Sequence, residues 1–451
     1  MKAMNATQIV DGSRFNAFHI ALIIWGFIII MFDGYDIVIY GSVVPVLMKE
    51  WSLSSVTTGA IGSYATLGTA VGALAFGYLA DKIGRKKVII ICTVLFSVFV
   101  PLAGMATSPV LFAICRVIAG LGLGGVMPNV IALTTEYAPK VSRAAIVSFV
   151  FCGYSIGGIL AGLVSRVMIP EMGWRPIFWF AAIPLLLLPF MMKSLPESYG
   201  QLLRRGEHGK VSQILGKVNP EFKPTGQDTF EVGQPSKEEK SSISKLFENN
   251  RGLSTVMFWL ACFSCFILIS ALNTWLPKLM METGYDLRSS LTFVMVLNAG
   301  AIIGTIIFGR LTDKKGFKII LIPLYVSGAL ALCAIGLQAP IMIAYLLIAV
   351  IGAASIGLQN LLNAYVSQFY PADIRSTGLG VYTAFGRMGG IVAPMLVGIL
   401  LTMQLTPQMN FVILSIAGLI GAIAISFVKD QRSEIKRQPI IGEDAESSVN
   451  L

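Results

Sequence analysis

Twelve long apolar stretches constrain the fold of this chain more than any other feature. Hydrophobic residues make up 55% of the 451 residues and charged residues only 13%, whereas soluble proteins have about 25% charged residues. A helix needs ~20 apolar residues to cross the hydrocarbon core of a bilayer. The sequence therefore predicts an all-α membrane protein with transmembrane helices near residues 17–40, 56–80, 88–107, 110–134, 145–167, 174–194, 254–281, 290–312, 317–337, 340–363, 376–402 and 408–428.

The distribution of positive charge predicts how these spans are oriented. The first stretch is too long and too acidic for a signal-peptide core, so we interpret it as a retained span. If both termini are cytoplasmic, most of the 34 Lys and Arg residues lie on the cytoplasmic side, as the positive-inside rule requires. The net charge of +10 is thus explained by topology, and we expect lipid rather than nucleic acid as a partner.

Composition divides the chain into four parts. A polar segment, residues 195–253, contains several prolines and a charge run at 237–240, and we interpret it as a cytoplasmic linker. It separates six spans in residues 1–194 from six in residues 254–428, and residues 429–451 form a cytoplasmic tail. Residues 198–218 could form an amphipathic surface helix, whereas 219–242 and the tail have the composition of flexible segments.

The two groups of spans repeat one another with an offset of 232 residues. Matching residues include Gly72 and Gly304, Gly120 and Gly352, Pro139 and Pro371, Arg143 and Arg375, and Gly157–Ile159 and 389–391. An offset of six helices keeps the same membrane orientation, so the halves are parallel repeats. The sequence predicts two six-helix bundles, and secondary transporters bind their substrates between such halves.

The loops after spans 2 and 8 carry the same motif. Gly77, Asp81 and Arg85 lie in the first loop, and Gly309 and Asp313 are the matching residues in the second. Glycine permits close helix contact at the end of the span, and the aspartate can cap a helix or pair with a base. We expect these residues to act in gating.

Four charged residues within the spans break the repeat: Asp33, Asp36, Arg116 and Arg387. The other half has Cys265, Leu268, Ile348 and Ser155 at the corresponding positions. Charges in the bilayer core are costly and are functional candidates by default. Residues retained in both halves are explained by the scaffold, so these four need another explanation.

The chemistry of these groups suggests a proton and an anion. Burial and a neighbouring carboxylate both favour the protonated form of a carboxyl group, so we expect Asp33, Asp36 and Arg116 to couple proton movement. The planar fork of an arginine suits a carboxylate, so we expect Arg387 to bind the substrate. The alternative is that two acids and two arginines form purely structural ion pairs. Which aspartate carries the proton stays open.

Weaker candidates are other polar and aromatic residues of the spans. Asn129, Asn298, Gln359, Asn360 and Asn363 could bind a hydroxyl group or ring nitrogen, or could equally bridge helices. Tyr35, Phe151, Tyr154, Trp275 and Phe385 could flank a ring, although aromatic residues on such helices usually pack. Glu136 is expected in the loop ion-pair network. The six cysteines lie in apolar segments, and we expect no disulfide, metal site or cofactor.

The loop motif, present twice, resembles the loop signature of the major facilitator superfamily. Residues 33–41, 116–129, 136–139 and 370–387 resemble more narrowly its aromatic acid:proton symporter family. In that family, the positions of Asp81, Asp313, Arg116, Arg375 and Arg387 and the acidic motif at 33–36 are functional. Phe317 departs from the pattern, because it occupies an arginine position in the second loop.

This resemblance implies proton-driven uptake of benzoate-like or hydroxybenzoate-like acids through the inner membrane of a bacterium. The protein would be a transporter and not an enzyme, and we expect a monomer. Two alternatives stay open: a symporter of another small acid such as nicotinate, or an exporter of organic cations by proton exchange. The ring substituents and the proton stoichiometry are not predicted.

Overall fold

The computed structural model of the protein describes residues 4–224, 228–231, 243–337, 339–371 and 374–429. Within these ranges, twelve helices are long and apolar enough to cross a membrane. The only strands among the described residues are two short ones of two residues each, β1 (Met4–Asn5) and β2 (Phe230–Glu231). The prediction of an all-α membrane protein with twelve spans is confirmed.

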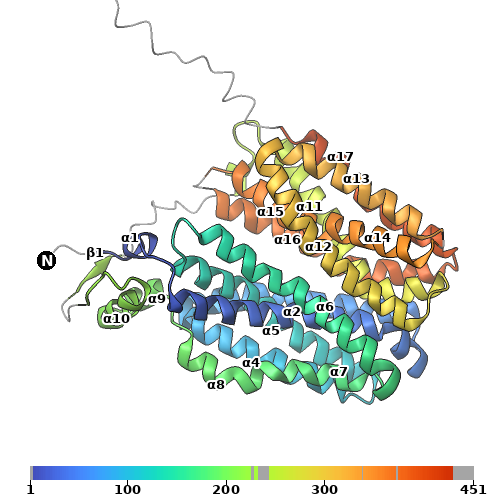
Figure 1. Ribbon diagram of the computed structural model, residues 1–451, viewed down its shortest axis with the longest axis horizontal. Coiled ribbons are helices and arrows are strands. Elements are labelled where there is room, and N and C mark those ends of the chain that lie inside the picture. The colour runs from blue at the N-terminus through green and yellow to red at the C-terminus, as the bar shows by residue number, and fades with distance from the viewer. Residues whose placement is uncertain (1–3, 225–227, 232–242, 338, 372–373, 430–451) are drawn as a thin grey trace, which may run out of the picture.

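The first six spans form one bundle, drawn in blue to green in Figure 1. Its helices are α2 (Ala17–Glu50), α3 (Ser55–Ile83), α4 (Arg85–Gly104), α5 (Pro109–Tyr137), α6 (Arg143–Met172) and a sixth span made of α7 (Arg175–Trp179), the 3-10 turn η1 (Phe180–Ala182) and α8 (Ile183–Ser194). Helix α2 continues beyond residue 40, where the predicted stretch ended, and passes through Pro45.

The last six spans form a second bundle, drawn in yellow to red (Figure 1). After the 3-10 turn η2 (Ile243–Leu246), its helices are α11 (Gly252–Glu282), α12 (Leu287–Lys315), α13 (Phe317–Ile335), α14 (Ile341–Gly352), α15 (Leu358–Phe369), α16 (Arg375–Thr402) and α17 (Pro407–Phe427). Helices α14 and α15 belong to one span, joined by a π-helical turn, η3 (Ala353–Gly357).

The 232-residue repeat is visible in the helix ends. Helices α3 and α12 begin and end at matching positions. Each begins after a residue whose side chain accepts hydrogen bonds from the first turn, Ser54 in one bundle and Asp286 in the other, as helix N-caps do. Each ends at a glycine with positive φ, 103° at Gly84 and 92° at Gly316, a backbone conformation that other residues avoid.

The packing inside the bundles repeats as well. A Cβ atom added to Gly68 would lie 2.5 Å from the carbonyl oxygen of Val117, and one added to Gly300 would lie 2.2 Å from that of Ala349. Both residues of this second pair are 232 positions beyond the first. Small residues let helix backbones approach closely in membranes, so the repeated glycines hold the same helix pairs together in both bundles.

Three pairs of helices join the bundles: α2 with α11, α3 with α16, and α6 with α12. We call the end of the bundles near residues 195–251 the linker end, and the opposite end the far end. Among the described residues, the close glycine contacts between bundles lie in the far half, for example Gly59 and Gly398 in the α3–α16 pair and Gly162 on α6. Towards the linker end, a Cβ added to Gly380 of α16 meets no atom within 4 Å. The bundles therefore touch mainly in the far half.

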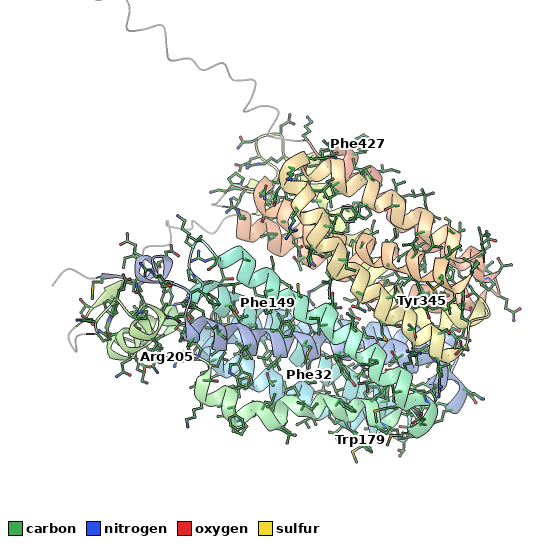
Figure 2. The ribbon with its side chains drawn as sticks, in the orientation of Figure 1. Phe32, Phe149, Trp179, Arg205, Tyr345 and Phe427 are labelled. Carbon is green, nitrogen blue, oxygen red and sulfur yellow. The ribbon has the colours of Figure 1, made fainter. Side chains whose placement is uncertain are left out.

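A small lobe lies at the linker end of the first bundle, at the left in Figure 1. It consists of β1, α1 (Ala6–Asp11), α9 (Tyr199–Arg204), α10 (His208–Val218) and β2, and the two strands pair in parallel. Arg205 marks this N-terminal lobe in Figure 2, while Tyr345 and Phe427 lie in the second bundle. Asp11 forms an ion pair of 2.5 Å with Arg143 of α6, which fastens the lobe to the bundle.

The lobe differs in part from the sequence interpretation of the linker. Residues 198–218 form α9 and α10, and Val211, Leu215 and Val218 of α10 are buried. The stretch 219–242, interpreted as flexible, contains β2, because the N-terminal segment supplies a partner strand that composition does not reveal. Residues 225–227, 232–242 and 430–451, which include the predicted tail except Lys429, lie outside the described residues.

Candidate functional site

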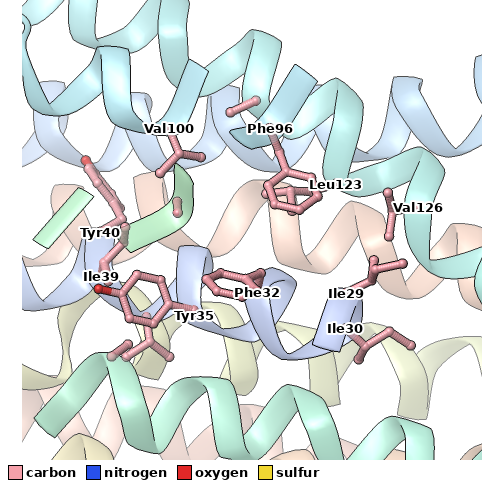
Figure 3. Packing of buried hydrophobic residues seen from close by; sticks show 14 of the residues in the cluster. Ile29, Ile30, Phe32, Tyr35, Ile39, Tyr40, Phe96, Val100, Leu123 and Val126 are labelled. Carbon is pink, nitrogen blue, oxygen red and sulfur yellow. The ribbon is translucent and has the colours of Figure 1, made fainter. Parts of the chain in front are cut away.

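Tight packing on both sides fixes the acidic motif of α2. A Cβ atom added to Gly34 would lie 2.0 Å from the carbonyl oxygen of Tyr154 on α6, so only glycine permits this helix contact. Phe32, which precedes Asp33, and Tyr35, which follows Gly34, are 6% and 4% exposed. Figure 3 shows both among apolar residues of α2 and neighbouring helices. The backbone that carries the two carboxylates is therefore held rigidly.

Asp36 forms a buried ion pair with Arg116 of α5. The guanidinium Nη1 donates a hydrogen bond to the Asp36 carboxylate, and the two residues are only 3% and 4% exposed. The guanidinium carbon also lies 5.5 Å from the ring centroid of Tyr40, a cation–π distance. The sequence named both residues as candidates for proton coupling, and the structure brings them into contact.

Asp33 has a different environment from Asp36, one turn away. It is 6% exposed, and within the described part of the chain its carboxylate forms no hydrogen bond or ion pair. It interacts electrostatically with Asp36 on its own helix and with Arg387 on α16 of the other bundle. Tyr154 also interacts electrostatically with both Asp33 and Arg387. Asp33 is thus a buried acid whose charge interacts at long range with a cation of the other bundle.

Arg387 of α16 contacts the first bundle through a single described hydrogen bond. Its Nη1 donates a long hydrogen bond of 3.5 Å to the hydroxyl oxygen of Thr69 on α3, and this hydroxyl donates to the Thr66 carbonyl at 2.7 Å. No described carboxylate pairs with Arg387. Sequence reasoning missed Thr69, because a threonine that bonds to the preceding turn has no distinctive sequence signal.

The other residues predicted to bind substrate lie in separate places. The Tyr35 hydroxyl donates to the Ile177 carbonyl at 2.7 Å, and Asn129 Nδ2 donates to the Gly125 carbonyl at 2.8 Å. Both bonds stay within the first bundle. These two side chains are thus occupied by backbone partners of their own bundle.

The two predicted asparagines of the second bundle form their hydrogen bonds within that bundle. Asn298 Nδ2 donates to the Val294 carbonyl at 3.0 Å, and its Oδ1 lacks a partner. Its amide lies against Gly158 of α6, at the bundle interface. Asn360 Nδ2 donates to the Thr305 hydroxyl at 3.3 Å, between α15 and α12. The amide nitrogens of both asparagines are thus engaged within the second bundle.

The repeated loop motif is largely unengaged in this structure. Asp81 and Asp313 are exposed, and neither has a hydrogen-bond or ion-pair partner among the described residues. The close helix contact expected at Gly77 is wrong for this conformation, because an added Cβ would meet no atom within 4 Å; at Gly309 it would meet only Leu361 at 3.9 Å. The helices that could cover these glycines do not approach them while the bundles touch mainly in the far half.

Glu136 joins the loop ion-pair network, as the sequence suggested. Its carboxylate lies 2.6 Å from Nη1 of Arg85 and accepts a hydrogen bond of 2.9 Å from the amide of Gly200 in the lobe. Sequence reasoning missed Glu197, whose carboxylate accepts from the Lys86 amide at 3.1 Å and so caps α4. Arg375 is exposed, and its Nε donates to the Tyr370 carbonyl at 3.3 Å.

The cysteines and possible metal ligands offer no further site. All six cysteines are free thiols, and Cys265 donates to the Ser355 carbonyl at 3.4 Å within the second bundle. The described residues contain no group of three or more His, Cys, Asp or Glu side chains that could hold a metal ion.

The four charged residues that break the repeat are arranged as one closed pair and one open pair. Asp36 and Arg116 neutralise each other within the first bundle. Asp33 and Arg387 lie on opposite bundles and influence each other without forming an ion pair. A guanidinium without a carboxylate partner can bind an external carboxylate, and an unpaired buried carboxyl group can accept a proton.

Comparison with known proteins yields a family match over most of the chain. The Major Facilitator Superfamily matches residues 26–394. The Benzoate transport protein of Acinetobacter baylyi is 42% identical over 437 residues, which cover 96% of this chain and 94% of that protein. The Gentisate transporter of Corynebacterium glutamicum is 34% identical over 434 residues, with 94% and 92% covered.

A solved structure with the same fold is that of the xylose transporter XylE from E. coli in a partially occluded inward open conformation. The TM-score is 0.73, the sequence identity is 20%, and the match covers 92% of this chain and 100% of that one. At this identity the likeness supports the arrangement of helices and not the choice of substrate.

Proposed function

Because the chain belongs to the major facilitator superfamily, as one of its aromatic acid transporters, we propose that it imports an aromatic monocarboxylate together with protons. The protein is a multi-pass membrane transporter and not an enzyme. The proposed substrate is benzoate, a hydroxybenzoate or a similar ring acid. The open charge pair of Asp33 and Arg387 carries this proposal.

The proposed binding step uses Arg387. Its guanidinium lies near the middle of α16, and its one hydrogen bond to a described residue is the long one to Thr69. A bidentate interaction with a substrate carboxylate would supply the missing counter-charge. An organic cation would be repelled from the same position, which disfavours cation export.

The ring preference is supported by the relatives. The proteins named for benzoate and gentisate each match more than nine-tenths of the chain, and both of these compounds are ring acids. We extend this substrate class to the present protein. Tyr35, Asn129, Asn298 and Asn360 remain proposed ligands only for a later step of the cycle, since their present hydrogen-bond partners lie within their own bundles.

The proposed cycle is alternating access. The excess of Lys and Arg at the linker end supports a topology in which that end and both termini lie in the cytoplasm of a bacterial cell and the spans cross the inner membrane. Contact in the far half then corresponds to an inward-facing state of a monomer. We propose that rocking brings the loop residues Gly77, Asp81, Arg85, Glu136, Gly309, Asp313 and Arg375 into play when the linker end closes.

Uptake into proteoliposomes tests the substrate class. Purified protein is reconstituted, an inward proton gradient is imposed, and labelled benzoate, 4-hydroxybenzoate, gentisate and nicotinate are offered in turn. We expect benzoate or a hydroxybenzoate to accumulate above its external concentration, and a protonophore to abolish this accumulation. If none of the four acids accumulates, the proposal is wrong.

A further inference from the structure

We propose that the two acids of α2 have different roles, an inference that rests on the proposed function. Asp33 carries the transported proton, whereas Asp36 and Arg116 form a fixed positioning pair. Proton and substrate are coupled because the Asp33 carboxylate and the substrate carboxylate both draw on the positive charge of Arg387.

The first support is the ion pair that Asp36 forms with Arg116. Its carboxylate accepts a hydrogen bond from Arg116, both side chains are almost fully buried, and Tyr40 lies beside the guanidinium. Protonating Asp36 would break this ion pair and leave a buried guanidinium without a counter-charge. Breaking a buried pair in this way is strongly unfavourable, so the pair is suited to holding α2 against α5.

The second support is that Asp33 has no direct ion-pair or hydrogen-bond partner among the described residues. Its buried carboxylate has no donor of a hydrogen bond among the described residues, so the ionised form bears its desolvation cost without a direct partner. A proton bound to one carboxylate oxygen removes that cost. No bond of the substrate forms or breaks, and the same proton leaves Asp33 on the cytoplasmic side.

The elements around α2 bring few other charges to Asp33. Asp36 faces it from α2 itself, Tyr154 from α6 and Arg387 from α16. The Arg116 charge of α5 is taken up by Asp36. The other charged residues of the helices that pack on α2 lie towards the ends of the spans or in the lobe: Asp81 and Lys82 on α3, Glu136 on α5, Arg143, Arg166 and Glu171 on α6, Arg175 on α7, Lys193 on α8, Lys210 and Lys217 on α10, and Lys278 and Glu282 on α11.

Linkage then follows from the shared cation. While Asp33 is ionised, the Arg387 charge is partly balanced across the interface, and a second carboxylate gains less by binding there. Protonation of Asp33 frees the full charge of Arg387 for the substrate. By thermodynamic reciprocity, substrate bound at Arg387 favours the proton on Asp33 by the same factor.

The position of Arg387 connects this linkage to rocking. Its contact with Thr69 joins α16 of the second bundle to α3 of the first. Asp33 and Arg387 belong to different bundles, so their separation changes when the bundles move. Binding and protonation can therefore shift the balance between the two access states.

Benzoate binding and proton uptake by the purified protein separate the two acids. In the wild type we expect one proton to be taken up per benzoate bound. Above the pH range in which Asp33 is protonated, the dissociation constant of benzoate should rise about tenfold per pH unit. In Asp33→Asn, benzoate still binds, the pH dependence is lost, and no proton is taken up. Exchange of labelled for unlabelled benzoate persists, but accumulation driven by a gradient does not. Asp33→Cys, which installs the residue of the other half, serves if the Asn variant does not fold.

A double variant, the control for Asp33→Asn, removes both charges of the Asp36–Arg116 pair. Asp36→Asn combined with Arg116→Gln leaves no unpaired charge, and we expect the folded protein to keep the uptake of one proton per benzoate and the same pH dependence. If this double variant loses proton uptake while it still binds benzoate, or if Asp33→Asn keeps it, the assignment to Asp33 is wrong. A wild type that takes up no proton and accumulates no ring acid would instead overturn the proposed function itself.

Discussion

The two bundles share one scaffold and differ in what their interiors carry. Gly68 with Val117 and Gly300 with Ala349 make the same contact in each half. The first bundle places Asp33, Asp36 and Arg116 in positions where the second has Cys265, Leu268 and Ile348. The repeated residues are explained by helix packing, and the unmatched charges have no such explanation. Departure from the repeat is thus the better guide to function.

A second difference concerns one pair of equivalent spans. Helix α5 is continuous from Pro109 to Tyr137, while the matching span of the second bundle is divided by the π-helical turn at Ala353–Gly357. Such turns are rare and occur mostly as single wide turns, often at functional sites. The carbonyl of Ser355 in this turn accepts a hydrogen bond from Cys265, the residue that corresponds to Asp33. The second bundle fills that position with a thiol where the first has a carboxylate.

The largest expected effect comes from breaking the helix contact that holds the acidic motif. In Gly34→Ala, the new Cβ would overlap the carbonyl oxygen of Tyr154 at 2.0 Å, and we expect a loss of about 3 kcal/mol or more and of nearly all uptake. Thermal unfolding in detergent measures the first and proteoliposome uptake the second. Gly380→Ala, where no atom lies within 4 Å, is the control and should not lower the melting temperature. A normal melting temperature for Gly34→Ala would contradict the contact.

The next effect concerns the closed pair that only the first bundle has. Arg116→Gln leaves the Asp36 carboxylate buried without its partner, which costs about 3 kcal/mol. Adding Asp36→Asn removes the remaining charge and should restore most of the loss. Melting temperatures of the single and double variants give the comparison, and equal values for the two would show that the pair is not coupled.

A smaller effect is expected from replacing Arg387 of the second bundle, which corresponds to Ser155 in the first. Arg387→Lys keeps the charge and loses the planar fork, so benzoate affinity should fall about tenfold, or about 1.4 kcal/mol. Titration calorimetry on the purified variant measures it. Unchanged affinity would mean that Arg387 acts only by its charge or does not touch the substrate.

The smallest effect compares the equivalent helix caps Ser54 and Asp286. A hydrogen bond from the Ser289 hydroxyl, with the amides of Ser289 and Arg288, holds the pKa of Asp286 below its ordinary value. A depressed pKa stabilises the folded state above the ordinary value of about 3.9, and this stabilisation is lost as pH falls through the folded pKa.

Replacement of the acid by its counterpart makes this cap testable. Asp286→Ser should cost at most about 1 kcal/mol near pH 6 and less near pH 3, where the aspartate of the wild type becomes protonated. The melting temperatures of both proteins at the two pH values give the answer. A difference that does not change with pH would show that the charge of the cap is unimportant.

The sequence could predict the spans and the repeat because both depend on local patterns. Apolar length determines a span, and a fixed offset exposes a repeat without knowledge of any contact. The same offset singled out Asp33 and Arg387, since a charge without a counterpart is visible in the sequence alone. Side-chain partners depend instead on how each helix is rotated, and therefore the pairing of Asp36 with Arg116 was left open.

Contacts between distant segments were beyond prediction for the same reason. Glu197 caps α4 from another part of the chain, and Asp11 reaches Arg143 only because the N-terminal lobe folds against the first bundle. Thr69 resembles any helical threonine until Arg387 of the other bundle is placed beside it. The expected contact at Gly77 was wrong because it depends on the conformational state as well as on the residue.

The central claim is that Asp33 and Arg387, two charges without a counterpart in the other half, couple the proton to the substrate, and making the halves alike at these positions tests it most directly. Asp33→Cys and Arg387→Ser each install the residue of the opposite half. Accumulation of labelled benzoate under an inward proton gradient is then compared with the wild type, using folded protein at equal amounts. The account predicts uphill accumulation in the wild type and none in either variant. Accumulation by either variant at the wild-type level would contradict it.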